Sequence, residues 1–433
     1  MQVQVTANGL ERRMTVALPA DRYDREIANR LKSLSRQVRL DGFRAGKVPL
    51  KVVERRWGGS VRQEVLNELV QSSYYEAINQ QQLRPAGLPR FEVQRGDAAG
   101  LTYTATFEVY PEVAFRLPAG LLVERPITEI TESDTDAMIE TLRKQRQRWT
   151  PVQRVARQGD RVTLDFKGSL AGAEFPGNAA EDFTVVLGSG SLIRSFEDQL
   201  AGLEAGYSGG IDVEFPADYR VQDLAGKRVR FEVTIHEVAE PTLPEVDDEF
   251  IRSFGVKEGG MAAFREEVKS TMRREAEQAV KERVKIQVMD ALLAANPMEL
   301  PKALVDEEMN RVKEQLSDAE RAGLAPGERA EALEDRARRR VALGLIIAEI
   351  IKKNQFKAAP ERVRAAVDAV AATYEHPEEV VKWYYAKHER LINVEALVLE
   401  DQTVEWVVQQ AQLQEKSMPF QELVAAYRGE GPA

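Results

Sequence analysis

The spacing of apolar residues changes along this 433-residue chain, and that change constrains the fold more than any other feature. From about Gly159 to Glu240 apolar residues alternate with polar ones, which is the pattern of half-buried strands. Beyond Pro241 and Pro244, which bracket a linker, they recur at every third or fourth position among strong helix formers. We therefore expect a small antiparallel β domain with one short helix near 196–200, followed by a helical domain.

The first 110 residues mix both spacings. Alternation predicts four strands there, and helical spacing predicts two helices. The expected strands are 2–6, 14–18, 91–94 and 101–109, and the helices are marked by apolar residues over 23–38 and 61–78. Strands and helices together indicate an α+β domain.

Residues 112–150 begin extended and then show a polar helix from about Ser133 to Arg148, with Ser133 expected as its N-cap. The last 190 residues show no internal repeat, and their helices are interrupted near 297–301, 323–327, 360, 377 and 419. We expect a multidomain α+β protein that ends in an all-α domain with arms. The expected boundaries are 1–111, a connecting arm at 112–150 that packs with the last domain, 151–241 and 242–433.

Cysteine and histidine, which often serve as metal ligands or catalytic residues, are absent or scarce. Cysteine is absent, which excludes disulfides, thiolate zinc sites and a cysteine nucleophile. The three histidines, His236, His376 and His388, leave little material for a metal cluster or a catalytic triad, and we expect all three at the surface. We expect no cofactor and no metal.

The N-terminal stretch Met1 to Leu18 lacks the basic and then apolar organisation of a signal peptide, and no run approaches 18 apolar residues. We expect a cytoplasmic protein without a membrane segment. The net charge is −10, yet residues 1–110 hold 17 Lys and Arg against 12 Asp and Glu. The acidic total argues against DNA binding, while the basic first unit leaves room for a local contact with RNA.

A short loop within the basic unit reads DGFRAGKVP over residues 41–49. The simplest interpretation is a turn between two helices, in which Gly42 and Gly46 supply permissive backbone and Pro49 begins the second helix. An apolar aromatic at Phe43, next to two cations, is unusual on an exposed tip, because the ring gains nothing unless a partner buries it. The cations suit phosphates or carboxylates.

The string GFRAGKVP resembles the trigger-factor signature GFRxGKxP at every fixed position. In that family the loop binds the large ribosomal subunit near the tunnel exit and touches a ribosomal protein and rRNA. The resemblance implies contact residues at Phe43, Arg44 and Lys47, in a loop shaped by Gly42, Gly46 and Pro49.

The β domain resembles the FKBP fold through three runs, GDRVTLDFKGSLAGAEF, DFTVVLGSGSLIRSFEDQLAGLEAG and VRFEVTIHEV. In that family an aromatic-lined pocket receives proline. Any one such aromatic is usually a core residue, but together and in register they favour the pocket. The matching positions are Phe166, Phe175, Phe183, Leu192, Ile193, Phe196, Tyr219 and Phe231.

The sequence departs from single-domain FKBPs at three positions: Phe196 stands in place of a Trp, Pro176 in place of an Asp, and Val221 in place of a Tyr. Macrolide binding is therefore doubtful, whereas proline turnover is expected to survive on an apolar floor. The stretch Leu187 to Ile193, LGSGSLI, begins like a dinucleotide loop. It lacks the third glycine and a surrounding βαβ unit, so we do not expect a nucleotide there.

The helical domain carries an apolar stripe, which is usually a helix-packing seam. Its residues are Val341, Leu343, Leu345, Ile346, Ile347, Ile350 and Ile351. The family resemblance implies that this domain and the connecting arm form a cradle for unfolded nascent chains, with client-contacting residues that the sequence does not identify.

The expected function is a ribosome-associated chaperone that holds nascent chains, assists their folding and export, and catalyses FKBP-type prolyl isomerisation. The alternative is a free-standing isomerase with helical arms that bind partners. A periplasmic chaperone is disfavoured because a signal peptide is missing. Self-association as a homodimer away from the ribosome stays open.

Overall fold

The computed structural model describes residues 1–41, 43, 47–96, 100–170, 173, 175, 177–217, 219, 221, 223–315, 326–374 and 376–429. By their contacts they divide into two compact units, 1–125 with 283–415 and 126–282 with 416–433. Among the described residues, no helix has both the length and the apolar character needed to span a bilayer.

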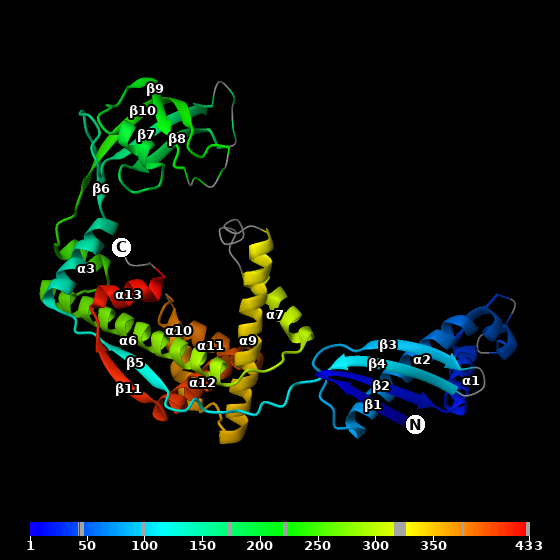
Figure 1. Ribbon diagram of the computed structural model, residues 1–433. Coiled ribbons are helices and arrows are strands. Elements are labelled where there is room, and N and C mark those ends of the chain that lie inside the picture. Colours follow the sequence, from blue (N-terminus) through cyan, green and yellow to red (C-terminus); the bar gives the residue numbers. More distant parts are fainter. Residues whose placement is uncertain are drawn as a thin grey trace. The chain divides into compact units, whose positions relative to one another are not determined.

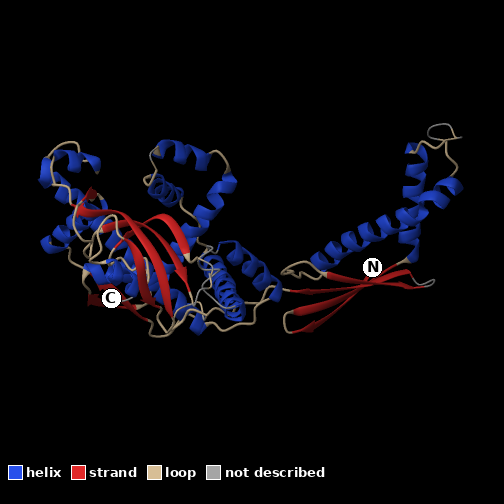
Figure 2. Cartoon of the chain, turned by 90° about the horizontal axis from the view of Figure 1, so that it is seen from above, coloured by secondary structure: helices blue, strands red, loops and turns tan. Residues whose placement is uncertain are grey.

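The N-terminal region folds as a four-stranded antiparallel sheet of order β1-β2-β4-β3, with a long helix along one face (Figures 1 and 2). Its elements are β1 (Gln2–Asn8), β2 (Glu11–Leu18), α1 (Ala20–Gln37), α2 (Leu50–Gln80), β3 (Arg90–Gly96) and β4 (Gly100–Glu108). The strands alternate, so that Met14 and Val16 of β2 and Tyr103 of β4 are fully buried. They meet the apolar face of α2 to form the core.

The four strands and two helices predicted from the spacing are confirmed. One local expectation was wrong: Pro49 is the N-cap of α2, with φ −60° and ψ 136°, and the helix begins one residue later at Leu50. Proline suits either position, since its missing N–H has no intrahelical partner there.

The connecting region contains β5 (Leu122–Ile127), α3 (Glu132–Gln145) and β6 (Arg148–Pro151). The N-cap of α3 is Thr131 and not Ser133. The Thr131 hydroxyl accepts a hydrogen bond from the Asp134 N–H at 3.2 Å, and the Asp134 carboxylate accepts one from the Thr131 N–H at 3.0 Å. This reciprocal capping box satisfies two backbone N–H donors. Ser133 lies inside the first turn of the helix, where its side chain cannot take the place of this cap.

The β domain is an antiparallel sheet of order β6-β10-β7-β8, with β9 also paired to β10. Its elements are β7 (Arg161–Ser169), β8 (Ala179–Val186), α4 (Arg194–Leu200), β9 (Ser208–Glu214) and β10 (Arg228–Thr242). The predicted antiparallel domain with one short helix is confirmed. Its sheet is extended by β6, which belonged to the predicted arm.

The remaining elements are helical except for one strand (Figure 1). They are α5 (Asp248–Ser253), α6 (Gly260–Ala295), α7 (Lys302–Gln315), α9 (Pro326–Asn354), α10 (Pro360–Ala371), α11 (Pro377–Tyr385), α12 (His388–Gln409), β11 (Gln412–Ser417) and α13 (Phe420–Arg428). Proline begins α10 and α11, as the predicted interruptions require. The apolar stripe is a packing seam at Ile346 and Ile350, which are fully buried among residues of α6 and α12.

Cations of α6 bind acids near the N-terminal end of α3. Arg265 bonds Glu132 at 2.7 Å and Asp136 at 2.6 Å, and Lys269 also pairs with Glu132. The hydrogen bonds from Lys269 and then Arg265 lower the pKa of Glu132 to about 2.

Replacing Ile350 with Ala removes a buried side chain from α9. We expect the local free energy of unfolding to fall by about 2–5 kcal/mol. Ile392→Ala is the matched control, because this helical isoleucine is 51 % exposed, and we expect a change within about 1 kcal/mol. Native-state hydrogen exchange of α6 and α12 amides measures both changes. Equal losses in the two variants would contradict the packing seam.

A second prediction concerns acid. Because the folded pKa of Glu132 lies below its ordinary value of 4.5, the carboxylate stabilises the α3–α6 contact above pH 4.5, and this contribution is lost as the pH falls towards 2. We expect hydrogen exchange in α3 to accelerate over this window in the parent chain. In Glu132→Gln that part of the pH dependence should vanish; an unchanged profile would show that other carboxylates control the contact.

Candidate functional site

The eight positions matched to the proline pocket come from four elements and three loops of the β domain. Phe166 lies on β7, Phe183 on β8, Phe196 on α4 and Phe231 on β10, while the others lie in loops. All eight belong to or pack against one apolar core cluster. The structure therefore brings together residues from Phe166 to Phe231 in the sequence.

Aromatic rings meet edge to face at the centre of this cluster. The ring of Phe166 lies 5.6 Å from Phe183 and 5.5 Å from Phe196, measured between centroids. Phe231 lies 5.0 Å from Phe196 and 6.0 Å from Phe166. Edge-to-face pairs of this kind add to the stability from burial, so the rings hold one another in place.

The cluster has a closed floor and a partly exposed rim. Phe196 and Phe231 are only 3 % and 5 % exposed, whereas Phe166, Phe175 and Phe183 are half-buried. A polypeptide can reach the rim rings, while the floor excludes water. Such a surface suits an apolar ring such as proline.

The Phe231 ring has space beside strand β7 because residue 168 is a glycine. A Cβ at this position would lie 2.5 Å from the Cε1 atom of Phe231. Glycine therefore lets the Phe231 ring approach the strand closely, which a side chain at this position would block.

Two residues that contact members of the candidate site were not predicted from the sequence. Phe215 is buried and packs against Tyr219, with ring centroids 4.8 Å apart. Its alternation with Ile211 and Val213 marks it as a core residue, but nothing in the pattern links it to Tyr219. The second is Glu197, a buried carboxylate on α4 that accepts two backbone hydrogen bonds. Of the departures from FKBPs, Val221 is exposed and Pro176 lies outside the described residues.

The glycine-rich stretch Leu187 to Ile193 lies between antiparallel strand β8 and the seven-residue helix α4. It is not the turn of a parallel βαβ unit, in agreement with the sequence-based prediction.

The basic loop is anchored at both ends in the N-terminal core. Val48 is buried, and Leu40 packs against the same cluster. Between them Phe43 is 41 % exposed, although its N–H donates to the Leu40 carbonyl at 3.0 Å. Lys47 and Pro49 are exposed, while Gly42, Arg44 and Gly46 lie outside the described residues. The anchored ends hold an apolar ring and a cation at the surface.

Potential metal ligands gather on the other face of the β domain. Donor atoms of Asp165, Asp182 and His236 lie within 4.8 Å of one another. Bonds within the group account for this approach, since the Asp182 N–H and the His236 ring, at 2.7 and 2.8 Å, both bond Asp165 and lower the pKa of its carboxyl. All three histidines are exposed, as predicted.

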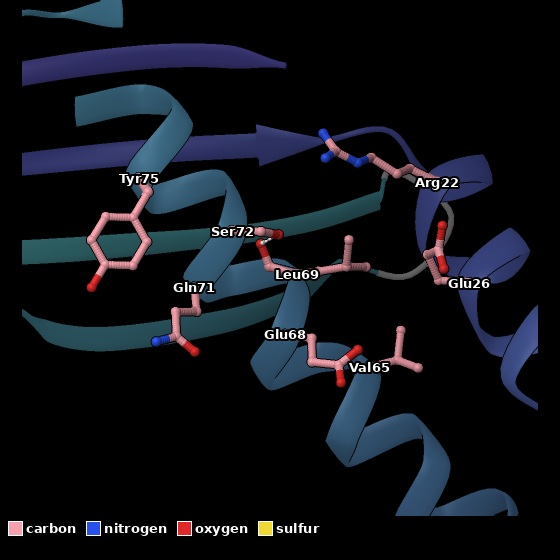
Figure 3. Close-up of a pocket in the computed structure, with 8 residues that line it drawn as sticks. All are labelled: Arg22, Glu26, Val65, Glu68, Leu69, Gln71, Ser72 and Tyr75. Carbon is pink, nitrogen blue, oxygen red and sulfur yellow. Dashed lines mark hydrogen bonds between the residues drawn. The ribbon is translucent and has the colours of Figure 1, made fainter. Parts of the chain in front are cut away.

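A separate hollow of about 540 Å³ lies beside α1 and α2 (Figure 3). Val65 and Leu69 contribute apolar surface, and Arg22 and Glu68 contribute charge. The charges are already paired, because Arg22 meets Glu76 at 3.5 Å and Glu68 meets Arg30 at 2.7 Å. The sequence analysis did not single out this hollow.

Three sequence-family profiles match the chain. The profile described as bacterial trigger factor protein (TF) matches residues 1–142, and that of the bacterial trigger factor protein (TF) C-terminus matches residues 260–409. The profile of FKBP-type peptidyl-prolyl cis-trans isomerase matches residues 152–236. The last of these ranges contains all eight residues of the aromatic cluster.

A solved structure described as "Promiscuous Substrate Recognition in Folding and Assembly Activities of the Trigger Factor Chaperone" covers 95 % of this chain and 100 % of its own, with a TM-score of 0.51 and 18 % identity. That likeness concerns the fold alone. Curated relatives are closer in sequence. The trigger factor of Thioalkalivibrio sulfidiphilus (strain HL-EbGR7) is 46 % identical, and that of Teredinibacter turnerae (strain ATCC 39867 / T7901) is 44 % identical, each alignment covering 98 % of both chains. The chain therefore belongs to the trigger factor family.

Proposed function

We propose that the aromatic cluster around Phe166 is the proline site of the isomerase, and that the loop at 41–49 is the ribosome-docking site. The chain is a ribosome-associated chaperone with FKBP-type peptidyl-prolyl cis-trans isomerase activity. A free-standing isomerase is not favoured, because the similarity extends over the N-terminal and helical regions as well.

One observation carries the proline site: a closed aromatic floor at Phe196 and Phe231 lies beneath a half-exposed rim. Rotation about an X-Pro bond breaks no covalent bond and meets a barrier of ~18–20 kcal/mol. Amide resonance stabilises the planar ground state through a polarised carbonyl. An apolar site that removes water from that carbonyl therefore favours the twisted transition state. Lowering the barrier by ~5 kcal/mol accelerates rotation by about 10³–10⁴.

The anchored loop supports the docking proposal. Phe43 is exposed although it is aromatic, and it gains stability only when a partner buries it. Lys47 beside it, with Arg44 in the same loop, suits the phosphates of rRNA and the carboxylates of a ribosomal protein. We assign these contacts to the large subunit at the tunnel exit, in the cytoplasm.

Holding and isomerising serve the same emerging chain. Synthesis at ~5–20 residues per second takes tens of seconds for a few hundred residues. Uncatalysed prolyl isomerisation takes tens to hundreds of seconds. A chaperone that holds an unfolded segment while its prolines isomerise shortens the time for which that segment stays exposed.

Removing the loop side chains tests docking. In Phe43→Ala combined with Arg44→Ala and Lys47→Ala we expect ribosome affinity to fall at least about a hundredfold, because an apolar anchor and two charges are lost. Co-sedimentation with 70S ribosomes at low and high salt measures this, alongside prolyl isomerase activity, which should not change.

The matched control for docking removes one exposed apolar residue and two exposed cations elsewhere in the same region, as Leu88→Ala, Arg90→Ala and Lys32→Ala. This variant should pellet with ribosomes like the parent chain. If both triple variants lose binding to the same degree, general basic charge explains docking and the loop assignment is wrong.

Phe196→Ala tests the proline site. We expect kcat/KM towards a short prolyl peptide to fall about tenfold or more, since the floor of the cluster opens to water. Ribosome docking should persist. Val155→Ala, an exposed apolar position of the same β domain, should keep full activity.

Hydrogen exchange of β7 and β10 amides must confirm that the Phe196→Ala domain is folded, because large core truncations cost about 3–5 kcal/mol. A folded variant with parental activity would place the proline site elsewhere.

A further inference from the structure

The glycine-rich loop between β8 and α4 encloses a buried carboxylate. Glu197 is 3 % exposed. Its Oε2 atom accepts a hydrogen bond from the Gly188 N–H at 2.7 Å, and its Oε1 atom accepts one from the Leu192 N–H at 3.0 Å. Both oxygens are thus engaged by the backbone of the same loop.

A buried carboxylate is costly unless its oxygens are hydrogen-bonded, and two converging backbone N–H groups supply that compensation. Glycine-rich loops elsewhere use such convergent N–H groups to bind phosphate. In this loop, which begins like a dinucleotide motif, the Glu197 carboxylate of the same chain occupies the two N–H groups. Gly188 fits this arrangement with φ +89°, a conformation that other residues rarely adopt.

The same helical turn carries the floor of the aromatic cluster. Phe196 directly precedes Glu197 on α4, and both N–H groups donate to the Ile193 carbonyl, at 2.8 and 3.2 Å. Leu192 and Ile193, which end the loop, pack partly exposed against the core of the site. Glu197 therefore ties the loop that carries two pocket residues to the helix that carries the floor.

We propose that Glu197 is a positioning residue of the isomerase, which holds the 188–192 loop so that Leu192 and Ile193 form one wall of the proline site. This inference rests on the proposed function of the aromatic cluster. Since the wall contacts the bound peptide before and during rotation, its loss weakens ground state and transition state alike. KM then rises while kcat stays nearly constant.

Glu197→Gln is the central variant, because the amide keeps the shape of the side chain but presents an NH₂ group to one of the two N–H donors. In the whole chain, assayed with a short peptide that contains one Leu-Pro bond, we expect KM to rise about tenfold and kcat to change less than about twofold. Glu197→Asp keeps the charge and loses reach, and should give a smaller rise in KM. Asp198→Asn, the exposed neighbour on α4, is the control and should behave as the parent chain.

Amide hydrogen exchange gives a second, independent readout. In the parent chain the Gly188 and Leu192 amides should be protected about a hundredfold or more, and Glu197→Gln should release this protection while β7 and β10 stay protected. Unprotected Gly188 and Leu192 amides in the parent chain would overturn the proposal, whether or not the variants fold. So would a folded Glu197→Gln variant with parental KM, or one in which kcat falls and KM is unchanged.

Different results would contradict the assignment of the aromatic cluster as the proline site. If the parent chain is active and Phe196→Ala has no effect, the aromatic cluster is not the proline site. If Phe196→Ala is impaired and Glu197→Gln is not, the cluster stands and the positioning role of Glu197 falls.

Discussion

Phe231 lies edge-on to Phe196, with ring centroids 5.0 Å apart, and the aromatic cluster proposed as the proline site is centred on this contact. Phe231 belongs to β10, the strand that pairs with β6, β7 and β9, so the sheet fixes its position. Phe196 comes from the one short helix of the domain. Each ring is held by a different element, and their edge-to-face contact joins the helix to the sheet. Gly168 is part of the same constraint, since only a missing side chain admits the Phe231 ring.

The β domain and the N-terminal loop differ in how they expose aromatic side chains. In the β domain, aromatic residues pack together so that the floor rings are buried and the rim rings are half-buried, and the proposed proline site would work by excluding water. In the N-terminal loop, Phe43 lies at the surface between the partly buried Leu40 and the buried Val48, where a binding partner could cover it. The first arrangement suits the proposed proline site within the chain, and the second suits the proposed docking contact with another molecule.

The ion pairs between α3 and α6 hold these two helices together. Arg265 and Lys269 of α6 both bond Glu132 of α3 and lower the pKa of its carboxyl to about 2. The role of this perturbed carboxylate is structural, since it joins the two helices. Among the described residues of the β domain, Asp160 and Glu197 are the buried acids. The Glu197 carboxylate differs from that of Asp160 because it accepts hydrogen bonds from the loop that carries Leu192 and Ile193 of the aromatic cluster. An isomerase that needs no acid or base can use a carboxylate in this way, as a backbone anchor.

The sequence by itself determined most of the elements and their order, because apolar spacing reports which face of a strand or helix is buried. The loop string and the aromatic register indicated the family. The sequence did not reveal β11, whose six residues are all exposed and pair with β5, nor the Thr131 cap, which depends on a reciprocal bond. The contact between Phe215 and Tyr219 and the bonds of Glu197 also required coordinates. Periodicity encodes burial along one element, whereas these contacts join residues of different elements, and only the tertiary structure decides which of them meet.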